Sequence, residues 1–172
     1  MPSISKASRH RILTRDRISR GETITGTLSR AKAGDTMNAT LAVLADFANQ
    51  SADGKLNILG AFDTIYAPSF PAAHPEMKVV VRFELHPAEA DQAKALEIQF
   101  RGSDGQKLLG LQGVLQVTVR PDSPAGEMLS THTILGINGL QLPAAGRYEF
   151  VVMINGDIKA LLPLRAIVRP QE

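Results

Sequence analysis

Two carboxylates and one imidazole are the side chains of this sequence best suited to chemistry. Asp46 interrupts an apolar stretch, Asp63 stands at the expected end of a strand, and His74 lies in the Pro-rich segment 67–76. Paired carboxylates suit general acid–base hydrolysis, and imidazole with carboxylate suits zinc or iron. Nothing in the spacing brings the three together. A small hydrolase or metal-dependent enzyme is therefore the alternative interpretation. The main interpretation is a non-catalytic protein, for which no catalytic residue, metal or cofactor is expected.

The two carboxylates also have a structural interpretation. A carboxylate in an apolar strand needs a hydrogen-bonding partner if it is buried. Asp46 and Asp63 are accordingly expected to cap backbone N–H groups or to pair with an arginine such as Arg82 or Arg147. Contact with a ligand is the alternative role for both residues.

Two aromatic residues lie on a proline-stiffened segment. Tyr66 and Phe70 belong to the run 65–71, which also contains two prolines. Such a segment is expected either to close one end of a domain, with its rings in the core, or to act as a recognition loop on a rigid scaffold. The second possibility gives another alternative function, the binding of a small ligand or carbohydrate.

Several functional classes lack the residues that they need. The sequence has no Gly-rich phosphate loop, no Gly-x-Ser-x-Gly elbow and no His-Glu-x-x-His motif. The absence of cysteine excludes disulfides, thiolate metal sites and a cysteine nucleophile. No apolar run approaches the roughly 18 residues that a membrane helix needs, so no membrane partner is expected.

Charge is distributed unevenly between the first 36 residues and the rest. Residues 1–36 carry eight Lys or Arg against three acids, whereas residues 37–172 carry eleven bases and fourteen acids. The first segment, with few and scattered aliphatic residues, is predicted to be a disordered basic extension. It is interpreted as a basic arm, an organelle transit peptide, or upstream sequence before a true start at Met37. Nucleic acid is expected as a partner only through this extension.

Residues 37–172 are predicted to form a β domain. Apolar and polar residues alternate with period two, and Asp53-Gly54 and Asp104-Gly105 mark hairpins between such runs. The segment 88–93 is the only helical candidate and is too short for a crossover helix, so the strands must be mostly antiparallel. The expected fold is all-β, a mostly antiparallel two-sheet β-sandwich of about eight strands.

The register of the last hairpin can be predicted from burial. A two-residue loop at Asn155-Gly156 would place Val152 opposite Lys159, with a charge on the apolar face. A three-residue loop over 155–157 instead places Val152 opposite Ala160, and Phe150 and Tyr148 opposite leucines. Because a one-residue slip reverses every side chain, the longer loop is predicted. Gly156 or Asp157 is expected to be left-handed.

Several of these motifs resemble those of one family. They are Asp46, Gly54-Lys55-Leu56, Gly60-x-Phe62-Asp63-x-Ile65, Phe70-Pro71, Gly105 and Gly146-x-Tyr148-x-Phe150. The run from about residue 38 to 168 resembles a bacterial family of small single-domain proteins of unknown function. The resemblance implies a cytosolic β-sandwich and supplies no activity, ligand or catalytic residue.

The sequence therefore favours a cytoplasmic, non-catalytic module that binds a partner. If Tyr148, Phe150 and Val152 face inward, apolar residues of the same hairpin must face outward. The expected interface consists of Val151, Met153 and Leu161, with Leu44 and Val80 as possible extensions. Contiguous exposed apolar surface marks a partner site, and pairing with a second copy through this face or an edge strand is its simplest use.

Overall fold

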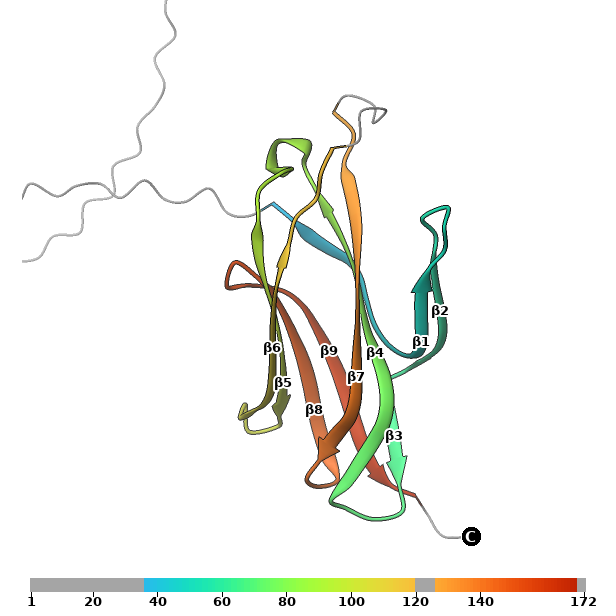
Figure 1. Ribbon diagram of the computed structural model, residues 1–172. Coiled ribbons are helices and arrows are strands. Elements are labelled where there is room, and N and C mark those ends of the chain that lie inside the picture. The colour runs from blue at the N-terminus through green and yellow to red at the C-terminus, as the bar shows by residue number, and fades with distance from the viewer. Residues whose placement is uncertain (1–35, 120–125, 170–172) are drawn as a thin grey trace, which may run out of the picture. The chain divides into compact units, whose positions relative to one another are not determined.

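The computed structural model describes residues 36–119 and 126–169, which belong to one compact unit, 34–172. The predictions for the basic extension concern residues that lie outside these ranges, apart from Thr36. The described residues form strands almost throughout, with one short 3-10 helix (Figure 1). The elements are β1 (Asn38–Gln50), β2 (Leu56–Phe62), β3 (Thr64–Ala67), β4 (Ala72–Leu85), η1 (Pro87–Glu89), β5 (Lys94–Gly102), β6 (Lys107–Leu115), β7 (Leu129–Leu142), β8 (Gly146–Ile154) and β9 (Asp157–Val168).

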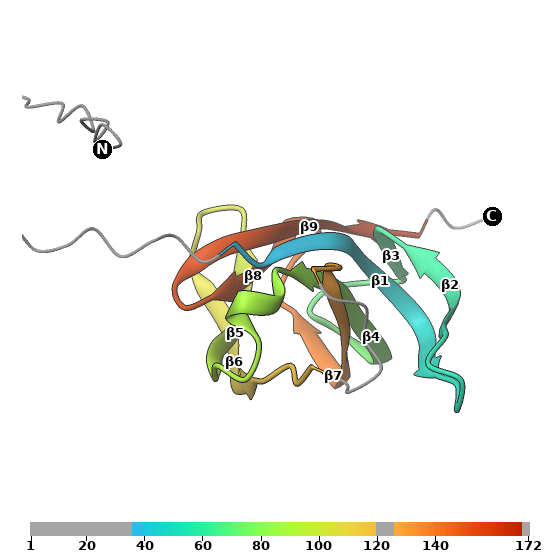
Figure 2. The same cartoon turned by 90° about the horizontal axis from the view of Figure 1, so that it is seen from above.

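The strands form two sheets that pack face to face (Figure 2). One sheet has the order β2-β1-β4-β7 and the other the order β3-β9-β8-β5-β6. All pairings are antiparallel except that of β3 with β9, which is parallel. The predicted mostly antiparallel two-sheet sandwich is confirmed. The described residues contain a ninth strand, β3, in a segment that the sequence suggested was a loop.

Alternating side chains of both sheets fill the space between them. Val79, Val81 and Phe83 of β4 lie in the core with Phe150 and Val152 of β8, as their period-two spacing predicts. The same core also contains Met37, Leu44, Ile65, Met77, Leu85, Ile98, Phe100, Ile137, Leu140, Leu142, Ile154, Leu162, Leu164 and Ala166. The core thus draws on both sheets along most of their length, which makes the sandwich the unit that positions every candidate site.

One glycine accommodates a change of direction in the first hairpin. β1 pairs with β4 as far as Ala45 and with β2 from Leu44 onward, and Figure 1 shows it curving away from β4 as it joins β2. At this point Gly60 adopts φ +67°, and the side chain of Asp46 lies over it. A Cβ at this position would be 2.9 Å from Cγ of Asp46 and closer still to Oδ2. Both the backbone angle and the approach of the carboxylate therefore require glycine here.

The last hairpin corrects one prediction and confirms the pairing that motivated it. The loop has two residues, because Ile154 pairs with Asp157, so the predicted three-residue loop is wrong. Val152 nevertheless faces Ala160, since a β-bulge at Lys159 restores the register that keeps apolar residues together. Asn155 and Gly156 both have positive φ, as an Asn-Gly turn of this length requires.

Asn155 also ties this turn to the neighbouring strand. Its Oδ1 accepts a hydrogen bond from the Ala95 N–H at 2.9 Å, and its own N–H donates to the Ala95 carbonyl at 2.8 Å. Replacing Asn155 by glycine keeps the left-handed backbone and removes the side-chain acceptor. We expect Asn155→Gly to lower the free energy of unfolding by about 1 kcal/mol in urea denaturation. Asn155→Ala should cost about 1 kcal/mol more, because alanine resists φ +51°.

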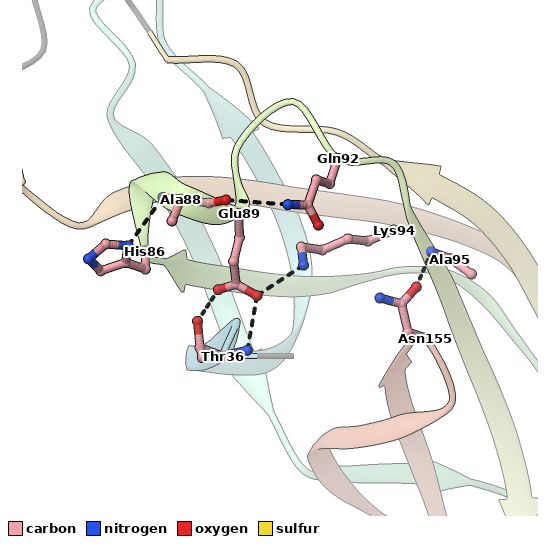
Figure 3. Close-up of polar contacts among 8 residues, drawn as sticks. All are labelled: Thr36, His86, Ala88, Glu89, Gln92, Lys94, Ala95 and Asn155. Atoms are coloured by element: carbon pink, nitrogen blue, oxygen red, sulfur yellow. Dashed lines mark hydrogen bonds and ion pairs between the residues drawn. The ribbon is translucent and has the colours of Figure 1, made fainter. Parts of the chain in front are cut away.

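A partly buried ionic cluster ties Thr36, just before β1, to η1 and the start of β5 (Figure 3). Glu89 Oε1 accepts from the Thr36 N–H at 3.0 Å and lies 3.2 Å from Nζ of Lys94, while the Thr36 hydroxyl donates to Oε2. The Lys94 and Glu89 side chains are only 5% and 17% exposed. Burial raises the pKa of Glu89, but the bonds from Thr36 and Lys94 outweigh it and hold the pKa below its ordinary value. The segment 88–93, predicted as the helical candidate, contains only the end of η1.

Candidate functional site

A cavity of about 570 Å³ lies at one end of the five-stranded sheet. Figure 1 shows the β5–β6 turn and the start of β8 at this same lower end. The turn contributes Gly102, Ser103 and Gly105, and the link between β2 and β3 contributes Asp63. The rest of the lining comes from Arg147, Tyr148 and Glu149 of β8 and from Pro163, Leu164 and Arg165 of β9. Its size lies in the range of small-molecule sites, which is roughly 300–1,000 Å³.

Two arginines face each other across the strands that line this cavity. Arg147 of β8 and Arg165 of β9 are cross-strand partners in the register. Arg165 has a loose ion pair with Asp63, Nη2 to Oδ1 at 3.7 Å, whereas the Arg147 side chain makes no hydrogen bond or ion pair within the described ranges. Like charges directly opposite each other on antiparallel strands are destabilising. The pair thus leaves positive charge available at the cavity.

Asp63 has two side-chain partners, Thr64 and Arg165. Its Oδ1 accepts from the Thr64 hydroxyl at 2.7 Å and faces Arg165. The hydrogen bond from Thr64, followed by the charge of Arg165, holds the pKa of Asp63 below its ordinary value against the effect of burial. The sequence correctly suggested an arginine partner, but Arg165 takes the place expected for Arg82 or Arg147. Arg82 instead pairs with Glu84 at 3.2 Å.

The surroundings of Asp46 and His74 differ from those of Asp63. Asp63 lines the cavity described above, and neither Asp46 nor His74 is part of its lining. Asp46 is exposed and lies over Gly60, while the His74 ring packs against Phe62 with centroids 5.6 Å apart. His74 belongs to strand β4 rather than to the expected loop. Across the residues that the structure describes, no cluster of three or more His, Asp or Glu is arranged to hold a metal ion.

The two aromatic residues of the proline-rich segment have different environments. Phe70 packs against the core, as a closing loop predicts. Tyr66 lies on strand β3 rather than on a loop and is 55% exposed. Neither ring lines the cavity beside Asp63. The structure therefore separates the two rings that the ligand-binding alternative placed together.

Two of the three residues of the expected apolar interface are covered rather than exposed. Val151 is 0% exposed and Met153 is 8% exposed, so the exposure predicted for these two residues is wrong. Both face away from the core but are flanked on β5 by Glu97 and Gln99, whose side chains are hydrogen-bonded to each other. Leu161 is exposed, at 57%, and remains available to a partner.

The two proposed extensions of that interface also differ from expectation. Leu44 belongs to the core and cannot extend an outer patch. Val80 lies on the outer side of β4, outside the core cluster, but is 0% exposed. An interface on the outer faces can therefore use little of the apolar surface that the sequence suggested.

Among the described residues, β7 is the longest strand at the end of a sheet, and its outer edge pairs with no other strand. This strand has 14 residues, pairs with β4 on one side, and ends its sheet in the described part of the chain (Figure 2). Its sequence, Leu-Ser-Thr-His-Thr-Ile-Leu-Gly-Ile-Asn-Gly-Leu-Gln-Leu, contains no Asp, Glu, Lys, Arg or Pro. Proteins usually protect edge strands with charges, proline or short length. The other sheet-end strands are shorter: β2 has seven residues, β3 has four and β6 has nine.

Together these features define a two-sheet, mostly antiparallel β-sandwich with one cavity at a sheet end and one long unprotected edge. The chain belongs to a family of unknown function, DUF6941, which matches residues 40–167. The resemblance to a family of unknown function, found in the sequence motifs, is thereby confirmed. No curated protein matches the chain.

The solved structures that are similar to this chain include two from Pseudomonas species. One is the alkylpurine DNA glycosylase AlkC of Pseudomonas fluorescens, bound to DNA containing an abasic site analog, with TM-score 0.43 and 12% identity over 77% of this chain. This chain covers 31% of the glycosylase chain. The other is an immunoglobulin-like protein of Pseudomonas aeruginosa, with TM-score 0.39 and 15% identity over 79% of this chain and 100% of that chain. In the described ranges, no helix is long and apolar enough to cross a membrane.

Proposed function

We propose that this protein is a non-catalytic interaction module whose main contact surface is the outer edge of β7, and that a second copy of the chain occupies it. The observation that carries the proposal is the length of this edge together with its lack of charge and proline. An unpaired edge presents a row of N–H and C=O groups that another strand can pair with. The cytoplasmic location implied by the sequence resemblance is part of the same proposal.

A second copy fits this edge because the strand is self-complementary. Two β7 strands related by a two-fold axis pair antiparallel, and their uncharged side chains do not repel each other. The regular part of β7 runs from Leu129 to Asn138, since Gly139 has φ +64°. Centring the axis on Ile134 places equivalent faces together and sets Ser130 of one copy opposite Asn138 of the other. Leu161 and β6 offer smaller surfaces for a different protein partner.

The register on β4 provides a sharp test. Ser130 faces Glu84 and Asn138 faces Glu76 within one copy, so lysine at both positions is compatible with the monomer. Across the proposed interface, however, the double variant Ser130→Lys/Asn138→Lys sets lysine opposite lysine twice. Each like-charge pair costs up to about 1 kcal/mol. We expect the dimer dissociation constant, measured on the full chain by sedimentation equilibrium, to rise about tenfold.

A matched variant distinguishes this interface from a general effect of charge. In a Glu76→Gln background, which removes the acid that faces position 138 within one copy, Ser130→Lys/Asn138→Glu sets opposite charges across the interface and should keep the dissociation constant near that of the wild-type chain. A wild-type chain that stays monomeric at high concentration would overturn the proposal. Equal weakening by the two double variants would overturn the register.

A further inference from the structure

We propose that the cavity beside Asp63 binds a small carboxylate with an apolar body, held between Arg147 and Arg165. This inference is independent of the β7 edge, which belongs to the other sheet. The cavity has the volume of a small-molecule site and is lined by ten residues from four parts of the chain. Pro163 and Tyr148 provide apolar lining beside a small number of polar groups, whereas the Leu164 side chain belongs to the core.

The arrangement of charge identifies the anionic group of the ligand. Arg147 and Arg165 are cross-strand neighbours, and the guanidinium of Arg147 has no ionic or hydrogen-bonding partner in the described ranges. An anion between the two guanidinium groups would convert a repulsive pair into two charge-assisted interactions. The planar fork of a guanidinium matches a carboxylate in a bidentate geometry. The Arg165 contact with Asp63, at 3.7 Å, is loose enough to be shared with such a ligand.

The acids of the same lining select against a more highly charged ligand. Asp63 and Glu149 also line the cavity, so its four charged residues balance. One additional negative charge is accommodated by Arg147, whereas a phosphate dianion would face two carboxylates. The lining also contains the hydroxyl of Ser103, whereas the Tyr148 hydroxyl donates to the Ala144 carbonyl at 2.7 Å. A monocarboxylate is therefore the head group that the cavity fits.

The carboxylate preference is testable with three probes that share one apolar ring. Benzoate, benzamide and phenyl phosphate are titrated into the full chain, and binding is followed by NMR shifts of the Gly102 and Gly105 amides. We expect saturable shifts with benzoate in the millimolar range and none with benzamide. Phenyl phosphate should bind more weakly than benzoate by about an order of magnitude.

Variants then assign the site. Arg147→Gln and Arg165→Gln should each weaken benzoate binding at least fivefold, as expected for the loss of one charge-assisted hydrogen bond. The matched control, Arg82→Gln, removes an arginine of the four-stranded sheet that lies outside this cavity and should leave benzoate binding unchanged. The proposal is overturned if benzoate gives no saturable shift, or if benzamide binds equally well. Equal effects of Arg147→Gln and Arg82→Gln would also overturn it. None of these three outcomes bears on dimer formation.

Discussion

Replacing Glu89 by glutamine is expected to lower the free energy of unfolding by about 3 kcal/mol at neutral pH. Glu89 is the anion of the partly buried cluster, facing Nζ of Lys94 and two donors of Thr36. Glutamine has nearly the same shape but no charge, so the buried ammonium loses its facing carboxylate. Breaking a buried ion pair by removing one partner is far more costly than removing an exposed pair. Urea denaturation of the full-length variant and wild-type chain measures the difference.

The same substitution predicts a dependence on pH with a definite sign. The pKa of Glu89 is lower in the folded chain than its ordinary value of about 4.5, so the unfolded chain takes up the proton first. The contribution of Glu89 to the free energy of unfolding is therefore complete above about pH 4.5. It is lost as the pH falls through the lower, folded-state pKa. The gap between wild type and Glu89→Gln should close in acid, because wild-type Glu89 is then protonated and resembles glutamine.

An exposed ion pair provides the control for this prediction. Glu76 bonds Lys78 at 2.7 Å, and its side chain is 60% exposed. Glu76→Gln removes the same charge from a solvated position and should change the free energy of unfolding by less than about 1 kcal/mol. A similar loss for both variants would show that the Thr36–Glu89–Lys94 cluster contributes no more than a surface contact. A gap that persists unchanged in acid would show that shape rather than charge explains the effect.

Replacing Gly60 by alanine is the second substitution expected to have a large effect, about 2 kcal/mol of lost stability. The backbone at Gly60 is left-handed, and a Cβ would overlap the Asp46 carboxylate. Alanine must therefore both strain the backbone and displace Asp46 from its position over β2. Thermal and urea unfolding of Gly60→Ala measure the total cost.

A double-mutant cycle separates the two causes. Asp46→Ala removes the carboxylate atoms that the new Cβ would meet, so it should recover part of the loss in the Gly60→Ala background. The remaining loss reports the left-handed backbone. Gly113 is the matched control, since no atom lies within 4 Å of its added Cβ and its φ is not left-handed. Equal costs for Gly60→Ala and Gly113→Ala would refute this explanation.

The fold could be predicted from local patterns because burial acts on every second residue of a strand. The alternation over Val79–Leu85 and Tyr148–Ile154 identified the inner faces correctly. It even identified the pairing of Val152 with Ala160, although a bulge at Lys159, not a longer loop, provides the register. A bulge adds one residue without changing which apolar side chains meet, so the hydrophobic pattern alone cannot distinguish it from a longer turn.

The candidate site was less accessible to sequence reasoning because it depends on contacts between distant segments. Asp63 was correctly singled out, but its partner, Arg165, becomes adjacent only when β3 pairs with β9. A centre shared with Asp46 and His74 was only an alternative without support in the spacing, and neither residue is part of the lining of the cavity that Asp63 lines. Exposure of Val151 and Met153 was misjudged because a sheet's outer face can be covered by long polar side chains of the neighbouring strand.

The parallel pairing of β3 with β9 has a consequence for biosynthesis. It joins Thr64 to Arg165 and Ala67 to Val168, so the two partners emerge from the ribosome about a hundred residues apart. Closing such a long chain segment carries an entropic cost before any contact compensates for it. β3 must therefore wait without its final neighbour until the segment 157–168 has been synthesised. The five-stranded sheet is accordingly complete only once β9 has been made, which makes β9 its closing element.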